Sequence, residues 1–245
     1  MSLALVHARY QLLEIMRVPA ALVGTVFFPV AAMLFFVVPF SGQHPVQATY
    51  ATASMATFSV ISSNLFQYGI GVAEDRNQPW DPYTRTLPAG PGPRLTGRIL
   101  ACLAMMFVSL LPVVLIAAVA TEASVTVGGF LAAAGTVVLI TVPFALMGLA
   151  IGYALPSKAA LAVAQVLFFP MAFGGGLMSP PGDAPKIIEV VAPYLPTRGA
   201  VELMWAAVGD FPVRPLSLLM LVVWTAAMGA LAVWAYRRDE GRRFT

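Results

Sequence analysis

Long runs without a charged side chain dominate the pattern of apolar and polar positions along this chain. Six of them are long enough for a helix to cross the hydrocarbon core of a bilayer, which takes about 20 apolar residues. They cover residues 18–40, 50–72, 99–120, 125–155, 159–178 and 216–236. The pattern therefore predicts an all-α integral membrane protein, with six transmembrane helices in one transmembrane domain over residues 1–245.

Composition supports this fold class. Of the 245 residues, 59% are hydrophobic and only 10% are charged, whereas soluble domains carry about 25% charged residues. The net charge of +3 is too small to indicate a nucleic-acid partner. Acidic Glu14 and the long apolar run after Arg17 argue against a cleaved signal peptide. Residues 1–17 are compatible with a helix that lies along the cytosolic interface or simply extends the first span.

The distribution of Lys and Arg predicts the orientation of the spans. Only Lys186, Arg198 and Arg214, of 14 such residues, fall on one side of the predicted topology. Cytosolic loops carry the excess of positive charge in membrane proteins. We therefore expect a multi-pass protein of the plasma (inner) membrane with both termini in the cytosol.

The second predicted span is the most polar of the six. On a helical wheel, Tyr50, Thr57, Asn64, Gln67 and Tyr68 fall within an arc of roughly 100°. Four of them, Thr57, Asn64, Gln67 and Tyr68, are candidates to line a translocation path. Hydrogen bonding to a neighbouring helix is the more common role of polar groups within spans, so both interpretations stay open.

A Gly-x-x-x-Gly spacing occurs in the fourth predicted span, at Gly148 and Gly152. This spacing allows two helices to approach closely. Because the span is rich in Gly and Ala, a chance occurrence is the explanation that we favour at this stage.

The loop predicted for residues 73–98 is the most highly charged part of the chain and is expected to be cytosolic. Its first half, AEDRNQPWDPYTRTLP, combines charged and aromatic residues, and the five prolines in residues 73–98 make a long helix after Asp81 improbable. Exposed aromatic side chains rimmed by charge are typical of a docking surface. Alternatively, Trp80 anchors in the lipid interface and the arginines only fix the topology.

The segment 179–215, expected on the outer side, predicts two short apolar helices separated by Pro193 and Pro196. Neither is long enough to span, so they form a re-entrant lid over the bundle or a passive interfacial loop. Three residues are candidate N-caps of the helices that follow them, namely Thr96, Asp183 and Thr197.

The sequence lacks the residues that several kinds of activity and binding site require. No Asp, Glu, Lys or Arg lies deep inside a predicted span, although ion-driven pumps usually need such relays. There is no GxxxxGK[ST] phosphate loop. His7 and His44 are the only histidines and fall on opposite sides of the predicted topology, which leaves no metal cluster. The single Cys102 forms no internal disulfide.

In their order along the chain, these features resemble the membrane (permease) subunit of a type-2 ABC transporter, in the class that exports drugs, polysaccharides or lipids. The loop carries Glu74-Asp75-Arg76, Trp80, Arg85-Thr86-Leu87-Pro88 and Gly97-Arg98, similar to the first cytosolic loop of that family. The outer segment carries Gly176 to Pro180, Ala184-Pro185 and Leu195-Pro196, similar to the family's outer helical hairpin.

The resemblance implies a function driven from outside the chain. A coupling helix in the first loop would dock on a separate ABC ATPase, which binds the ATP and Mg, while this chain holds no cofactor and is not itself an enzyme. A second permease chain, identical or paralogous, and membrane lipid would complete the assembly. The cargo would be a hydrophobic or amphipathic molecule moved by alternating access.

The resemblance also assigns residues to these roles. The ATPase-docking residues would be Glu74, Asp75, Arg76, Trp80, Tyr83, Thr84 and Arg85. The outer gate would be formed by Gly176, Pro180, Pro185, Leu195 and Pro196.

Two other classes remain as alternatives. A membrane prenyltransferase would explain the acidic motif followed by Arg85-Thr86-Leu87-Pro88, but such enzymes need a second acidic motif on the same side, and the other short loop there, Pro156-Ser157-Lys158, has none. A membrane scaffold subunit without transport activity would have the same hydropathy.

Overall fold

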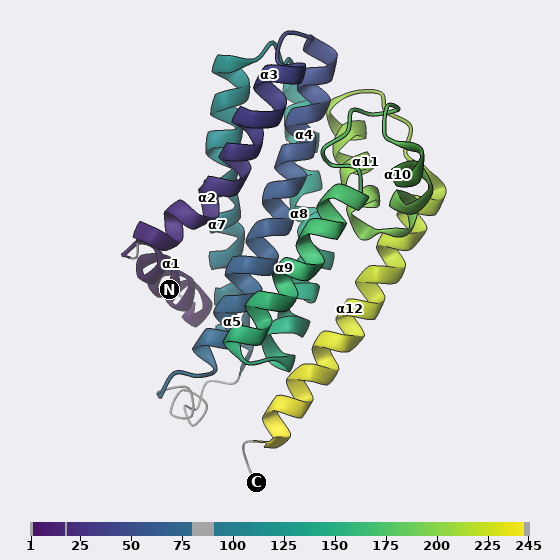
Figure 1. Cartoon of the computed structure of the whole chain (residues 1–245). Coiled ribbons are helices and arrows are strands. Elements are labelled where there is room, and N and C mark those ends of the chain that lie inside the picture. Colours follow the sequence, from purple (N-terminus) through teal and green to yellow (C-terminus); the bar gives the residue numbers. More distant parts are fainter. Residues whose placement is uncertain (1, 18, 80–90, 243–245) are drawn as a thin grey trace.

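The computed structural model describes residues 2–17, 19–79 and 91–242, and these are helical over most of their length. Figure 1 shows a bundle of long helices with a smaller hairpin packed on one end. The elements in chain order are α1 (Leu3–Met16), α2 (Pro19–Ala32), η1 (Met33–Val37), α3 (Val38–Ser41), α4 (Pro45–Ser62), η2 (Ser63–Gly69), α5 (Ile70–Asp75), α7 (Pro91–Ala120), α8 (Val127–Ala154), α9 (Ser157–Gly174), α10 (Lys186–Val191), η3 (Ala192–Tyr194), α11 (Pro196–Val208) and α12 (Pro215–Arg242).

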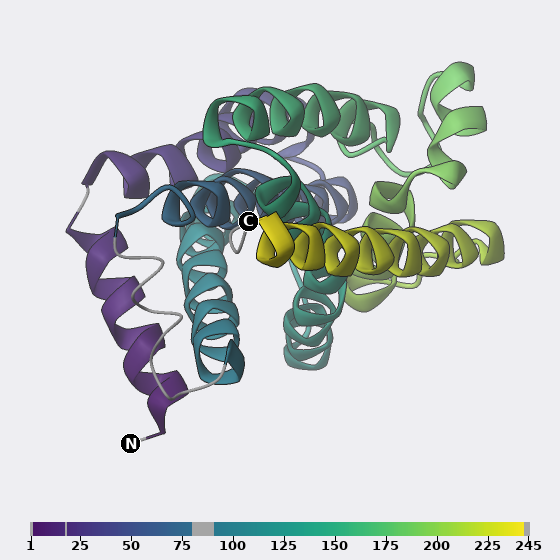
Figure 2. The ribbon, with the colours of Figure 1, turned by 90° about the horizontal axis from the view of Figure 1, so that it is seen from below.

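The bundle has two distinct ends. At the lower end in Figure 1, α5 finishes at Asp75 and α12 finishes near the C-terminus; we call this the loop end. At the opposite end lie the α3–α4 turn and the α10–α11 hairpin; we call this the hairpin end. Helix α1 lies apart from the bundle axis and packs beside α7, as both views show (Figures 1 and 2).

In the part of the chain that the structure describes, four helices are long and apolar enough to cross a membrane, over Thr96–Ala120, Val127–Ala154, Ser157–Gly174 and Pro215–Asp239. The first two predicted spans fall on interrupted helices instead: residues 18–40 on α2, η1 and α3, and residues 50–72 on α4, η2 and α5. In the first of these, Val26–Ser41 is a shorter apolar helix. The all-α membrane fold class is confirmed, and the count of six spans stays a prediction.

Two π-helical turns interrupt these helices, and each has a local cause. Pro39 has no N–H for the carbonyl of Phe35, which lies in η1. Before η2, the Ser62 hydroxyl donates to the Ser59 carbonyl at 3.0 Å, and Asn64 Nδ2 donates to the Val60 carbonyl at 2.7 Å. Such side-chain bonds compete with the regular backbone ladder. A π turn changes the direction in which the following side chains point around the helix axis.

The glycines of α8 form a close helix contact. A Cβ on Gly148 would clash with the Asn64 carbonyl oxygen, and one on Gly152 with the Gly69 carbonyl oxygen. Gly69 lies equally close, because a Cβ there would come 2.9 Å from the Gly148 Cα. The backbones of η2 and α8 thus touch through three glycines, and our interpretation of this spacing as a chance occurrence is wrong.

The hairpin packs into the bundle rather than lying loosely over it. Trp205 of α11 is fully buried, and its Nε1 donates to the Tyr50 carbonyl at 3.1 Å and to Ser54 Oγ at 3.0 Å. Phe211 stacks edge-on against Trp205 with ring centroids 4.9 Å apart. Helix α11 also contacts α8 and α12. The hairpin end of the bundle is therefore closed over α4 by a packed aromatic cluster.

Three predicted helix caps are wrong. Helix α7 begins at Pro91, which places Thr96 inside the helix. Helix α10 begins at Lys186, directly after Pro185, so Asp183 lies outside the capping position. Pro196 opens α11, and the Thr197 hydroxyl donates instead to the Met171 carbonyl of α9 at 2.8 Å. In the last two cases, a proline already fixes the backbone where the cap was expected.

Candidate functional site

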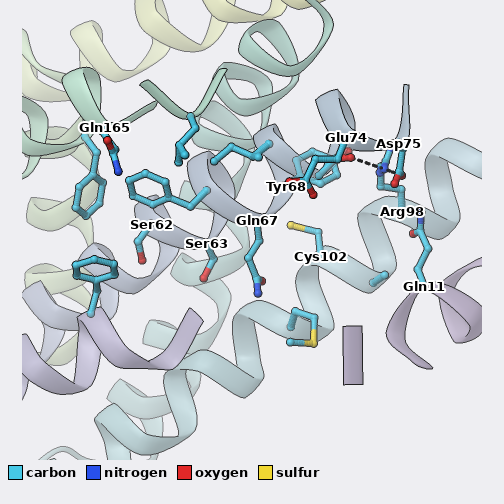
Figure 3. A pocket seen from close by; sticks show the side chains of 18 of the residues that line it. Gln11, Ser62, Ser63, Gln67, Tyr68, Glu74, Asp75, Arg98, Cys102 and Gln165 are labelled. Carbon is cyan, nitrogen blue, oxygen red and sulfur yellow. Dashed lines mark hydrogen bonds and ion pairs between the residues drawn. The ribbon is translucent and has the colours of Figure 1, made fainter. Parts of the chain in front are cut away.

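A cavity of about 550 Å³ lies towards the loop end, between α1, η2, α5, α7 and α9. Figure 3 shows its side chains, with a polar end around Arg98 and Tyr68 and an apolar end of phenyl rings. Clefts of this size accommodate small-molecule ligands, and they are typically apolar with a few polar groups. The cavity is thus the candidate functional site among the described residues.

Element η2 supplies the central wall of the cavity through Ser63, Phe66, Gln67 and Tyr68. In a regular α-helix these four side chains would spread over more than one face. In the π-helical turn all four line the cavity. Two of the four residues predicted for the translocation path, Gln67 and Tyr68, therefore line the cavity.

The other two predicted path residues point into the packed core. Thr57 is fully buried, and its hydroxyl donates to the Ala53 carbonyl of its own helix at 3.0 Å. Asn64 is also fully buried, and its Oδ1 accepts a weak bond from Cys102 Sγ of α7 at 3.7 Å. Only Asn64 forms the bond to a neighbouring helix that we considered as the alternative, and a path along the face of the second span stays a prediction.

The polar end of the cavity is built around an ion pair. Arg98 of α7 pairs with Asp75 at the end of α5, and its guanidinium also donates to the Gly71 carbonyl at 3.4 Å. The Arg98 side chain is only 12% exposed. Glu74 lines the same end. This pair joins α5 to α7, the two helices on either side of the loop predicted to be the coupling loop.

The opposite end of the cavity is aromatic. Phe28, Phe66, Phe168 and Phe169 line it. Phe168 is held edge-on between Phe66 and Phe58, with ring centroids 5.1 Å and 4.9 Å away. These contacts fix the buried ring of Phe168, whereas Phe28 and Phe169 are about half exposed. The cavity therefore offers a rigid aromatic floor with an open apolar rim.

Arg76 ties the start of the predicted coupling loop to the far side of the bundle. Its guanidinium donates to the carbonyls of Gly152 and Leu155, at 2.6 Å and 3.3 Å, and pairs with Asp239 of α12. Asp239 is only 5% exposed. One side chain therefore connects the end of α5 to the ends of α8 and α12.

Breaking the pair between Arg76 and Asp239 is expected to lower the stability of the purified protein. Asp239→Leu removes a charge-assisted bond and leaves a poorly solvated guanidinium, at a cost of about 2 kcal/mol. The melting temperature in detergent measures this loss. Exchange of the two charges, R76D with D239R, should recover part of it, and D210N at the exposed hairpin end is the control. An unchanged melting temperature for Asp239→Leu would contradict the role of this pair.

Of the predicted ATPase-docking residues, Glu74, Asp75 and Arg76 have the places given above. Trp80, Tyr83, Thr84 and Arg85 lie outside the described residues. The role of all seven stays a prediction.

The predicted outer-gate residues lie at the joints of the hairpin. Gly176 adopts a left-handed φ of 79° in the turn after α9, and Pro180 follows in the connection to α10. Pro185 precedes α10, Leu195 precedes α11, and Pro196 is its buried first residue. These residues shape the turns, and their role as a gate stays a prediction.

A buried ion pair holds the hairpin beside these joints. Arg198 Nε donates to Glu202 Oε1 at 2.6 Å, and the two side chains are 5% and 0% exposed. Glu202 Oε2 also accepts the backbone N–H of Arg214 at 3.0 Å. The Arg198 guanidinium lies over the Trp205 ring, 5.0 Å from its centroid. Glu202 thereby fixes both α11 and the start of α12.

Comparison with known proteins now decides the family. The family model for the ABC-2 type transporter matches residues 3–208, which include the cavity, the Arg76 contacts on α5 and α8, and the hairpin through α11. The chain belongs to the ABC-2 type transporter family. It is also similar to the "Putative transport permease YvfS" of Bacillus subtilis (strain 168), with 21% identity over 219 residues, 88% of this chain and 89% of that protein.

In this ABC-2 type transporter, the sequence did not indicate that several residues line the cavity or form its neighbouring ion pairs. Gln11 and Glu14 line the cavity from α1, and Arg98 and Asp239 form ion pairs with partners far away in the chain. The one available signal was the stripe of His7, Gln11 and Glu14 along the N-terminal helix. A polar stripe on an interfacial helix can face either water or the helix bundle. Here Gln11 and Glu14 face the bundle.

Proposed function

We propose that this chain is the permease subunit of an ATP-driven exporter, which moves a hydrophobic or amphipathic molecule out of the cytosol or the inner leaflet. Membership of the ABC-2 family makes it a transporter membrane subunit, whose general partner is an ABC ATPase. The direction of transport, the cargo class, the docking loop and the pairing of two permease chains are parts of the proposal.

One observation carries the proposal: the cavity adjoins both ends of the predicted coupling loop. Asp75 and Arg98 line the cavity and pair with each other on either side of residues 76–97. An ATPase that docks on this loop would therefore act on two walls of the cavity, α5 and α7, at once. Differential affinity for the cargo in two arrangements of these walls is what alternating access requires.

The two ends of the bundle suggest where the cargo enters and where it is released during a transport cycle. The cavity has contributions from α1, the predicted cytosolic interface helix, so an amphipathic cargo can reach it along that surface. The hairpin end is closed by the cluster around Trp205 and Phe211. On this proposal the cargo enters from the side of the cavity, and its release needs movement of the hairpin.

Removal of the predicted docking side chains is expected to separate the ATPase from the permease. In co-expression with a candidate partner ABC ATPase that co-purifies with the unaltered chain, W80A combined with R85E should reduce co-purified ATPase about tenfold or more, because aromatic and Arg anchors dominate most interfaces. F40A, at an exposed aromatic residue of α3, is the control and should leave the complex intact. Equal recovery of ATPase with both variants would argue against docking through this loop.

The same preparation tests the remaining alternative. A scaffold subunit would bind the ATPase, but no cargo would stimulate ATP hydrolysis or cross the membrane of a proteoliposome. An exporter shows both cargo-stimulated hydrolysis and accumulation on one side. The prenyltransferase alternative is not supported by the family match.

A further inference from the structure

The cavity has unsatisfied polar atoms at one end. The Tyr68 side chain is 5% exposed, and its buried hydroxyl has no hydrogen-bond partner. The buried side-chain oxygen of Gln11, which lines the same cavity from α1, also has none. Figure 3 shows both residues near the ion pair of Arg98. Leaving such atoms unpaired costs free energy, so a ligand that bonds to them would be favoured.

The charges around these atoms are mainly negative. Among the residues that the structure describes, three carboxylates line the cavity, those of Glu14, Glu74 and Asp75, together with one guanidinium, that of Arg98. Asp75 is paired with Arg98, whereas Glu14 and Glu74 take part in no ion pair with a described residue. Two of these lining carboxylates therefore have no ion-pair partner among the described residues, and both belong to exposed residues.

The rest of the lining selects the body of the ligand. Phenyl rings of Phe28, Phe66, Phe168 and Phe169 face a space of about 550 Å³. Aromatic faces attract organic cations as well as apolar groups. Unpaired acceptors, carboxylates and aromatic rings in one cavity are complementary to a positively charged, N–H-bearing group on an apolar body.

We propose that this cavity binds an amphipathic organic cation, with its charged nitrogen near Glu14, Glu74 and Tyr68 and its apolar body against Phe168. The inference rests on the proposed function for its role as a cargo site, and it names the cargo class. An anionic amphiphile of similar shape would meet the same two carboxylates unfavourably.

Two dyes that share the xanthene ring system test this assignment. Rhodamine 6G is a cation with N–H groups, and fluorescein is an anion at neutral pH. The full chain in phosphatidylcholine nanodiscs should bind rhodamine 6G saturably, measured by fluorescence anisotropy against empty nanodiscs, and should not bind fluorescein. Equal binding of the two dyes would overturn the proposal.

Substitutions locate the binding. E14Q combined with E74Q should weaken rhodamine 6G binding about tenfold or more, as expected for the loss of two nearby charges, and Y68F should weaken it severalfold. E122Q, in the exposed turn before α8, is the control and should not change it. The reversed variant E14K with E74K should gain fluorescein binding, a result that misfolding cannot produce. Unchanged dye preference in the reversed variant would refute the assignment.

Two further measurements identify the source of the cation and distinguish this inference from the proposed function. Competition by phosphatidylethanolamine in the disc would identify a lipid ammonium as the ligand, and its absence a soluble amphiphile; either result supports the assignment. Dye binding needs no ATPase, so loss of ATPase co-purification with intact dye binding would reject the proposed function alone. A coupled complex without cation preference would reject the present inference alone.

Discussion

Gly148→Leu is expected to abolish the folded bundle or to leave too little of it for transport. Any side chain at this position meets the Asn64 carbonyl oxygen and the backbone of Gly69. Backbone atoms cannot rotate away as side chains do, so α8 and η2 would have to separate. Overpacking of a core typically costs about 1–3 kcal/mol, and a backbone clash belongs at or above the top of that range. Monodispersity and melting temperature in detergent measure the effect.

A matched control lies on the same helix. Gly135 of α8 has no atom within 4 Å of the place where a Cβ would stand. Gly135→Leu adds the same side chain to the same apolar helix, and we expect a nearly unchanged melting temperature. If both variants lost the same stability, leucine itself would be responsible, and the glycine contact would not be the cause.

Glu202→Ala is expected to have the second largest effect. It leaves the guanidinium of Arg198, whose side chain is 5% exposed, without its buried partner, and it removes the acceptor for the Arg214 N–H. Loss of one member of a buried pair costs about 3–5 kcal/mol. We expect the hairpin to loosen from α12 before the whole bundle unfolds, because Glu202 joins these two elements. Limited proteolysis between α11 and α12, together with the melting temperature, measures this.

Two further variants separate charge from packing. E189A removes an exposed glutamate of α10 in the same hairpin and should have little effect. Replacement of both partners by apolar residues, R198M with E202L, should recover most of the loss, because a buried pair is often no more stabilising than a well-packed apolar pair. A double variant as unstable as Glu202→Ala would show that the backbone bond to Arg214 dominates.

The helical segments could be predicted from the sequence because they depend on local properties. Runs free of charge outline α8 and the start of α12 closely, and the prolines of the hairpin correctly separate α10 from α11. The start of α7 was missed because Arg94 and Arg98 end the uncharged run, although an α-helix readily contains arginines beyond the apolar stretch. The length of an uncharged run therefore does not give the length of the helix that contains it.

The candidate site was only partly predictable because it depends on distant pairs. Gln67 and Tyr68 were identified as polar residues of one span on a wheel that assumed a regular helix, whereas Thr57, ten residues before Gln67, is buried in the core. The π turn of η2 breaks that regularity, and its cause lies in side-chain bonds that no hydropathy pattern contains. Likewise, Arg76 and Asp239 pair across most of the chain, and nothing in either local sequence indicates the other.

The pair between Asp75 and Arg98 has a consequence for how a protein partner could act on the chain. It joins the end of α5 to the N-terminal part of α7. The chain between Asp75 and Arg98 is therefore connected at both ends to the same ion pair. While the pair holds, a force on these residues would reach both helices. Because α5 also contacts α9, we expect movement of the joined helices relative to α9 to change the space around Phe168.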